Sequence, residues 1–278
     1  MMSDQSHLPW IIVGYGRVGQ AIALLGERLA VEVRATWNRT QAAANRAAVP
    51  SPAPHYGPLP KALKEHLKEP VLLWVTIVDD AIESTFSSLG QSLCEGSIAV
   101  HTSGSLASTI FDGPPTVATA SLHPLQAIST PRAAVERFDR SFWTIEGDDA
   151  AVNYLNPLLA PAGIEPVRID PPQKVLYHAA AATAANLLVS LLDAAIAMAR
   201  AADIEAVTAR RMLVELGRSS LENLVAQPPQ RALTGPSSRG DLAVIERHRR
   251  ALAELDDATL VEIYDLLTQR ALHGLSDD

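Results

Sequence analysis

Apolar residues in the first 170 positions form short runs that alternate with stretches of helical periodicity. The nearly continuous runs WIIV, VLLWVTIV and SIAV are typical of strands buried on both faces of a parallel sheet. VEVRATWN, SFWTIEG and IEPVRID are further strand candidates, whereas residues 49–60 contain five prolines and predict a loop or an edge strand. Alternating β and α segments predict an α/β domain built on a doubly wound parallel sheet.

The pattern changes after Pro171 and Pro172, where strand candidates give way to helical periodicity. Helices are predicted over residues 174–201, 204–226, 241–255 and 258–274. Proline suits the first turn of a helix, so this pair marks a plausible boundary. We therefore expect two domains, an α/β domain over residues 1–170 and an all-helical domain over residues 171–278.

The predicted helix 174–201 is apolar on nearly all sides, unlike a helix with one face in water. Its polar residues Lys174, His178, Asn186 and Asp193 fall within an arc of roughly 120° at 100° per residue. The helix is long enough to span a bilayer, but Asn186 and Asp193 in its middle make that costly. We therefore expect a helix buried in a soluble protein, between the two domains and against a second subunit.

Composition narrows the classes of function. The formal net charge of −8 argues against a nucleic-acid-binding protein, which is normally basic. The single cysteine, Cys94, excludes an intramolecular disulfide and a cysteine-based zinc site, so no metal site is expected. The first ten residues lack the pattern of a signal sequence, and we expect a cytoplasmic protein.

The sequence VGYGRVG places three glycines in the spacing of a dinucleotide-binding loop, between a strand and a helix. The glycines allow a tight turn, a close approach of the backbone to a pyrophosphate, and close packing of helix on strand. The helix N-terminus then offers free N–H groups to the phosphates. A Rossmann domain is therefore expected, with the cofactor bound by Gly14, Tyr15, Gly16, Arg17, Val18 and Gly19.

The residues that end the second strand predict which dinucleotide binds. NAD-dependent enzymes usually have a carboxylate there, but this chain has Asn38, Arg39 and Thr40. Arginine pairs with phosphate, and Asn and Thr add neutral donors, so the pattern favours NADP(H). The alternative is that this segment is an ordinary helix N-cap and that Arg39 is an exposed arginine without a role in binding.

The ends of two later strands are expected on the same rim of the sheet. Backbone at Thr76, Ile77 and Val78 should flank the ribose and the nicotinamide. Ser103, in HTSGS, could bind the cofactor amide or the substrate, and an ordinary turn serine is an equally good interpretation.

Hydride transfer needs the protein to supply or accept a proton, and three segments offer suitable groups. Lys174 and His178 lie one turn apart at the start of the long helix, and His123 lies in SLHPLQAIS. A solvent lysine and a buried, hydrogen-bonded histidine are the structural alternatives. The third segment is LTGPSSRGD, which is either a substrate-binding loop or a turn between helices in which Asp241 caps the next helix.

Taken together, VGYGRVG, VTIVDDAI, HTSGS, SLHPLQAIS, KVLYHAAAATAANLL and LTGPSSRGD resemble the Rossmann-like proteins that carry the DUF2520 domain. These proteins are similar to pyrroline-5-carboxylate reductase and to the 6-phosphogluconate dehydrogenase superfamily. The resemblance implies a helical C-terminal domain that dimerises, and an NADP-dependent oxidoreductase. In the hydroxyacid-dehydrogenase branch a catalytic lysine begins the long helix and an asparagine follows four residues later; Lys174 matches, and His178 departs. His123 matches the histidine of the HP stretch in prephenate dehydrogenases.

From the sequence we therefore expect an NADP(H)-dependent oxidoreductase that acts on a small polar carbonyl, imine or hydroxyl compound and forms a homodimer through its helical domain. The expected catalytic residues are Lys174, His178 and His123. The expected substrate-binding residues are Asn186, Ser238, Arg239 and Asp241. The alternative is a non-catalytic NADP-binding sensor or assembly protein.

Overall fold

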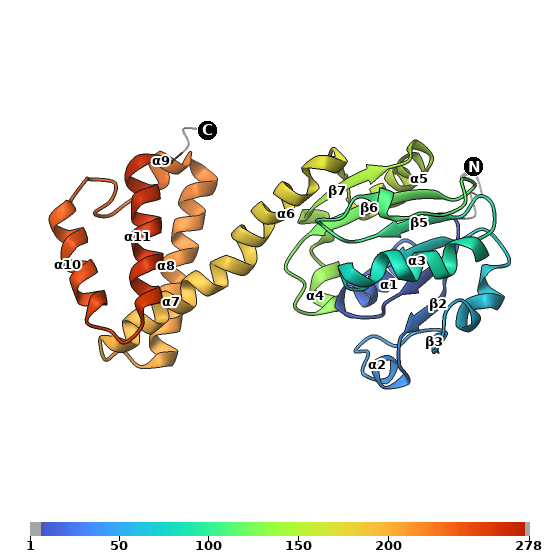
Figure 1. Cartoon of the computed structure of the whole chain (residues 1–278), viewed down its shortest axis with the longest axis horizontal. Helices are drawn as coiled ribbons and strands as arrows, with labels where there is room; N and C mark the ends of the chain where they lie inside the picture. Colours follow the sequence, from blue (N-terminus) through green and yellow to red (C-terminus); the bar gives the residue numbers. More distant parts are fainter. Residues whose placement is uncertain (1–6, 276–278) are drawn as a thin grey trace. The chain divides into compact units, whose positions relative to one another are not determined.

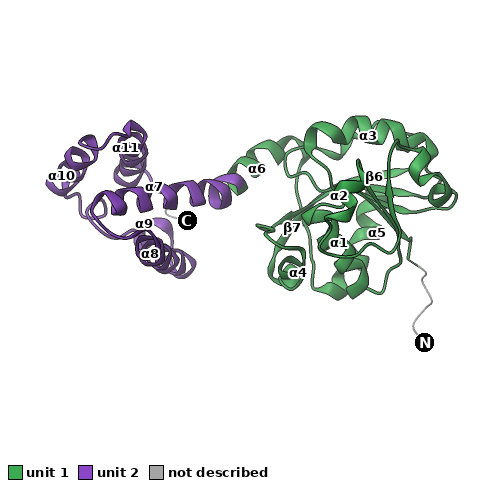
Figure 2. Ribbon diagram, turned by 90° about the horizontal axis from the view of Figure 1, so that it is seen from below, with its two compact units in different colours: residues 1–181 green, residues 182–278 purple. Residues whose placement is uncertain are grey.

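The computed structural model describes residues 7–275, which form two compact units that meet between residues 181 and 182 (Figure 2). The first unit contains the sheet and the start of the long helix. The second unit is helical. The division lies at residues 181/182, inside the helix and not at the proline pair, because the first turns of the helix pack on the sheet unit.

The first unit is built on an eight-stranded sheet in the order β3-β2-β1-β4-β5-β6-β7-β8. Neighbouring strands are parallel except β6 and β7, which are antiparallel. The strands are β1 (Trp10–Val13), β2 (Val33–Asn38), β3 (Pro54–Tyr56), β4 (Leu72–Val75), β5 (Ile98–His101), β6 (Ala118–Leu125), β7 (Phe142–Gly147) and β8 (Val167–Arg168).

Helices cover both faces of the sheet because side chains of each strand alternate between two separate apolar clusters (Figures 1 and 2). Trp10 and Ile12 of β1 pack with α1, α4 and α5, whereas Ile11 and Val13 pack with α3 and a 3₁₀ helix. The elements are α1 (Arg17–Arg28), α2 (Gln41–Asn45), the 3₁₀ helix η1 (Lys61–Leu67), α3 (Ile82–Leu89), α4 (Pro131–Val135) and α5 (Asp149–Leu159). A sheet with nearly all-apolar strands, as the sequence predicted, can be covered in this way.

The strand order places a topological switch between β1 and β4, and ligands of such sheets bind beyond the carboxyl ends of the strands there. The chain leaves β1 into the glycine loop, β4 into Thr76 and β5 into Thr102, so all three segments lie on one rim. His101 of β5 pairs with Ser121 of the parallel strand β6, so His123 lies two residues further toward the same rim.

Helical segments run without a break from residue 174 to residue 201: α6 (Lys174–Ala182), a π-helical segment η8 (Thr183–Leu187) and α7 (Leu188–Ala201). Among the described residues, the stretch Pro171–Ala201 is long and apolar enough to cross a membrane, judged by length and composition alone. Core helices of soluble proteins have similar lengths and compositions.

The second unit continues with α8 (Ala206–Ala226), α9 (Pro229–Ala232), α10 (Leu242–Ala253) and α11 (Ala258–His273). Its buried core is small and centres on Ala194, Leu252 and Leu260. In the single chain Val175, Leu187 and other apolar residues of the long helix are exposed, so its burial between the domains and against a second subunit stays a prediction.

Candidate active site

The glycine loop between β1 and α1 is built as its spacing predicts. Gly14 has φ +98°, and a Cβ there would lie 2.5 Å from Ile77 Cγ2. A Cβ on Gly19 would lie 2.2 Å from the carbonyl oxygen of Gly14, so this helix turn can pack on the loop only as glycine. Gly16 differs, because a Cβ there would have no atom of the described chain within 4 Å. Two glycines therefore serve packing, and the third leaves open space over the loop.

That open space lies at the N-terminus of α1. Gly16 is the N-cap, no side chain of the described residues bonds to this cap, and Gly16 and Arg17 are exposed. Free N–H groups and the positive end of the helix dipole favour an anion at this point. The loop therefore fits the pyrophosphate of a dinucleotide.

Tyr15 and Asn38 support the loop from within. The Tyr15 backbone N–H donates to Asn38 Oδ1 at 3.2 Å, which ties the loop to the end of β2. The Tyr15 ring packs in the core, its hydroxyl donates to the Pro50 carbonyl at 3.4 Å, and burial raises its pKa to about 12. The Tyr15 side chain thus belongs to the fold, and only its backbone belongs to the loop.

Arg39 and Thr40 follow β2 and are both exposed. The Thr40 hydroxyl accepts a hydrogen bond from the Ala43 N–H at 3.2 Å and caps α2. Thr40 therefore matches the ordinary N-cap interpretation, whereas the exposed guanidinium of Arg39 is available to an anion at this edge.

Thr76 closes the loop from the neighbouring strand. Its hydroxyl lies 2.6 Å from the Gly14 carbonyl oxygen and 3.3 Å from that of Val13. Ile77 packs against Gly14, and Val78 is 74 % exposed on the rim. The end of β4 therefore shapes the loop through side chains as well as backbone.

A pocket of about 380 Å³ joins the glycine loop to the ends of β4, β5 and β6. It brings together the expected cofactor residues Gly16, Arg17, Val18 and Thr76 with the expected catalytic residue His123. Thr102, Pro124, Gln126 and Ile128 complete its lining. Residues that are more than 100 positions apart thus meet in one cavity.

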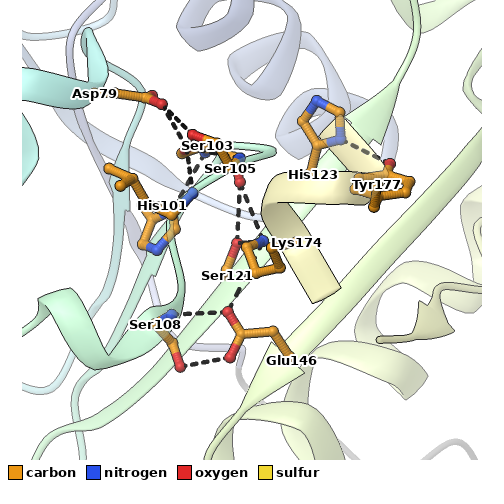
Figure 3. Close-up of polar contacts among 11 residues, drawn as sticks. Asp79, His101, Ser103, Ser105, Ser108, Ser121, His123, Glu146, Lys174 and Tyr177 are labelled. Carbon is orange, nitrogen blue, oxygen red and sulfur yellow. Dashed lines mark hydrogen bonds and ion pairs between the residues drawn. The ribbon is translucent and has the colours of Figure 1, made fainter. Parts of the chain in front are cut away.

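His123 belongs to a cluster of three aromatic side chains from β6 and α6. Its Nδ1 lies 2.9 Å from the Tyr177 hydroxyl, and its ring centroid lies 5.7 Å from that of His178 (Figure 3 shows His123 and Tyr177). Burial, and next the proximity of His178 and Lys174, lowers the pKa of His123 to about 4. His123 is therefore neutral at neutral pH.

His178 has an unusual environment. Its Nδ1 is buried and makes no hydrogen bond to any residue from 7 to 275. A Cβ placed on Gly104 would lie 2.4 Å from this Nδ1 and 2.9 Å from His123 Nε2. Two imidazole nitrogens therefore converge on a position that has to be glycine.

Lys174 is completely buried, which departs from the expectation that it faces a substrate. Its Nζ donates to Ser121 Oγ at 2.7 Å and to the Ser103 carbonyl at 3.3 Å, and lies 3.9 Å from Glu146 Oε1. Burial lowers the pKa of Lys174, and the nearby carboxylates of Glu146 and Asp79 oppose this effect.

Ser103, which was expected near the cofactor, points its hydroxyl to Asp79 Oδ2 at 2.8 Å, and its Oγ accepts the Leu106 N–H at 3.0 Å. This hydroxyl therefore holds the turn after β5 together.

The expected substrate-binding residues lie in the second unit. Asn186 is exposed in η8, and Arg239 is exposed in the turn before α10. Ser238 Oγ donates to the Gly235 carbonyl at 2.9 Å, and Asp241 caps α10 by accepting the Val244 N–H at 3.2 Å. The turn and the cap suggested by the sequence are both present.

The structure adds two residues to which the sequence had assigned no role, Ser121 and Glu146, and it brings Tyr177, Asp79 and Gly104 to the same site. Glu146 carried a signal, because a carboxylate inside the predicted strand SFWTIEG is costly to bury without partners. Tyr177 stands next to His178 in the sequence. The others meet only through the fold.

Comparison with known proteins agrees with this architecture. Residues 141–271 match DUF2520, a domain of unknown function. No curated protein matches the sequence.

Among solved structures, an NADP oxidoreductase of inferred activity from Bacteroides fragilis superposes with a TM-score of 0.76 at 19% identity, covering 97% of this chain and 99% of that one. The reductive aminase from Aspergillus terreus, in complex with NADPH and ethyl-5-oxohexanoate, has a TM-score of 0.65 at 18% identity, with 96% and 94% covered. Plasmodium falciparum pyrroline carboxylate reductase with NADP bound has a TM-score of 0.61 at 10% identity, with 96% and 98% covered.

These likenesses extend over nearly the whole of each chain, and at such identities they establish the fold. The resemblance seen in the sequence is confirmed by the match over residues 141–271. Residues 141–271 thus match the DUF2520 domain, and the fold of the chain is a Rossmann-type domain followed by a helical C-terminal domain, as in these neighbouring structures.

Proposed function

We propose that this protein is an NADP(H)-dependent oxidoreductase that transfers a hydride to or from a small polar carbonyl, imine or hydroxyl compound. The observation that carries the proposal is the pocket in which the glycine loop and the N-terminus of α1 meet His123. An anion-binding loop and a proton-handling side chain in one cavity are what such a reaction requires.

The cofactor assignment rests on the residues around the loop. The open space at Gly16 and the free N-terminus of α1 suit a pyrophosphate, and exposed Arg39 suits the 2′-phosphate of NADP(H). The nicotinamide, when bound, supplies or accepts the hydride. NADP or NADPH is bound in the neighbouring structures from Plasmodium and Aspergillus, which supports the same choice here.

His123 is the residue that we assign to the reacting oxygen or nitrogen of the substrate. If the Tyr177 hydroxyl donates to Nδ1, the single proton of the neutral ring lies on Nε2, which faces Gly104 and His178. Nε2–H can then donate a hydrogen bond to the carbonyl oxygen or imine nitrogen and polarise that group as the hydride arrives. Tyr177 fixes the tautomer, and the unpaired Nδ1 of His178 gives the site a second hydrogen-bonding group.

The second unit is proposed to supply substrate contacts and the dimer interface. Asn186, Ser238, Arg239 and Asp241 remain candidates for substrate binding. The exposed apolar side chains of α7 and α8, such as Val189 at 68% and Leu216 at 63%, support a homodimer through this unit.

The cofactor assignment is tested by fluorescence titration with NADPH and NADH. We expect a clear preference for NADPH that Arg39→Glu reverses, because a carboxylate repels the 2′-phosphate. Arg140→Glu, an exposed arginine changed in the same way on η5 (Phe138–Arg140), is the control and should keep the preference. An unchanged preference in Arg39→Glu would remove Arg39 from the site.

Turnover is tested by following NADPH oxidation with a panel of small polar ketones and imines. His123→Ala should lower kcat on the order of 100-fold or more while NADPH affinity stays near that of the unchanged protein. If NADPH binds tightly and no compound of the panel is reduced, the non-catalytic NADP-binding sensor becomes the better explanation.

A further inference from the structure

The turn that follows β5, residues 103–108, lies over a network of buried polar groups that the proposed chemistry does not use directly (Figure 3). Ser121 and Lys174 are 0% exposed and Glu146 is 2% exposed. Burying an ammonium and a carboxylate costs several kcal/mol unless each is paired and hydrogen-bonded. This cost indicates that the buried network has a structural or functional role.

The first contact of the network is with one peptide group. Lys174 Nζ donates to the Ser103 carbonyl at 3.3 Å, and the Ser121 hydroxyl donates to the same oxygen at 3.2 Å. This carbonyl belongs to the planar peptide group that joins Ser103 to Gly104. Two donors on one oxygen fix the orientation of that plane.

Gly104 is the position on which His123 and His178 converge. The contacts of a notional Cβ, 2.4 Å to His178 and 2.9 Å to His123, show that the Gly104 backbone is packed against both rings. A shift of this peptide by a fraction of an ångström must therefore move one ring or open a gap beside it.

Other contacts hold the two ends of the turn. Glu146 accepts the Ser108 N–H at 2.7 Å and the Ser108 hydroxyl at 2.8 Å. Asp79 Oδ2 accepts the hydroxyls of Ser103 and Ser105, each at 2.8 Å. With both ends held, the remaining freedom is the tilt of the Ser103–Gly104 peptide, whose carbonyl Lys174 and Ser121 both contact.

We propose that Lys174 is a positioning residue: paired with Glu146 and acting through Ser121 and the Ser103–Gly104 peptide, it sets the placement of His123 and His178, and it does not exchange a proton with the substrate. The part that concerns catalysis rests on the proposed function. A fully enclosed Nζ with its bonds directed at Ser121, Ser103 and Glu146 is suited to holding backbone in place and has no path to a substrate atom.

A double-mutant cycle between Lys174 and Ser121 tests this proposal, because Ser121 is enclosed and also contacts the Ser103 carbonyl. Lys174→Met, Ser121→Ala and the double variant are compared in protein labelled with ¹⁵N-histidine. We expect both single variants to shift the ring signals of His123 and His178, and the double variant to resemble Lys174→Met. Their kcat values should fall about 10-fold or more without adding in the double variant, because both act through one peptide.

Leu155→Ala is the control for a general loss of stability. Leu155 lies in the core on α5, away from the turn, so this variant should leave the ring signals of His123 and His178 in place. If Lys174→Met does not fold, Ser121→Ala alone still shows whether the peptide positions the rings. Wild-type ring signals and kcat in Ser121→Ala, with turnover abolished in Lys174→Met, would overturn the proposal and make Lys174 the proton donor. The ring signals need no substrate, so a failure to find turnover would not hide this result.

Discussion

The two units of this chain distribute polar and apolar groups in opposite ways. Among the described residues, all buried polar and charged side chains belong to the first unit, from Gln20 to Lys174. The second unit leaves much of its apolar surface exposed: the 21-residue helix α8 buries Ala209 alone, while Met212, Leu216 and Val225 are exposed. One unit has a complete core with a polar site inside it, and the other has an incomplete core.

This difference shows where each unit obtains its stability. The first unit buries two apolar clusters, one on each face of its sheet, and can afford the cost of an enclosed lysine and glutamate. The second unit buries little within itself, and large exposed apolar surfaces are typical of interfaces. We propose that a second copy of the chain covers this surface and contributes to the stability of the unit.

The largest expected effect comes from placing a charge on the exposed helix face. Met212→Arg should weaken the proposed dimer about 100-fold, because an interface centre tolerates an unpaired charge poorly. Analytical ultracentrifugation over a range of concentrations measures the dissociation constant directly.

Val167→Arg is the matched control, because Val167 on β8 and Met212 are each 54 % exposed. It should leave the dimer intact, since it lies on the first unit. A wild-type protein that sediments as a single chain at every concentration would contradict the comparison, because the second unit would then be stable without a second copy.

An effect of intermediate size is expected from acid, through two buried histidines of the first unit. Burial lowers the pKa of His101 and of His123 to about 4, so both stay neutral in the folded state at pH values where the unfolded chain binds protons. Their contribution to stability is complete above about pH 6.5 and is lost as pH falls toward 4, by up to about 3 kcal/mol for fully enclosed His101.

Urea unfolding measured between pH 7 and pH 4.5 tests whether the stability of the first unit falls as the pH falls. Tryptophan fluorescence is the probe, because it is confined to that unit. The four tryptophans, Trp10, Trp37, Trp74 and Trp143, all lie in the first unit, so their emission reports on it alone. His101→Gln should flatten the pH dependence of the tryptophan transition. Equal pH dependence in both proteins would show that His101 is not held neutral.

The parts of the fold that the sequence predicted are those set by neighbouring residues. Apolar strands and the spacing of Gly14, Gly16 and Gly19 are local patterns, and the strands, the loop and the helical second half are confirmed. The polar network could not be predicted in this way, because Lys174 and Glu146 meet only after β6 and β7 pair antiparallel, with Ser121 opposite Glu146. Burial of the long helix against a second subunit stays a prediction, because its composition suits a buried helix and an interface helix equally.

The smallest expected effect concerns Asp241, for which the sequence left two interpretations open. Its carboxylate caps α10, so Asp241→Ala should lower the stability of the second unit by about 1 kcal/mol, whereas Asp241→Asn should keep the cap. Far-UV circular dichroism during urea unfolding reports the helical unit and separates the two variants. If Asp241 also binds substrate through its charge, Asp241→Asn will raise KM at unchanged stability. Equal destabilisation by Asn and Ala would instead show that the cap depends on charge, and that the thin core of the second unit draws on the helix dipole as well as on hydrogen bonding.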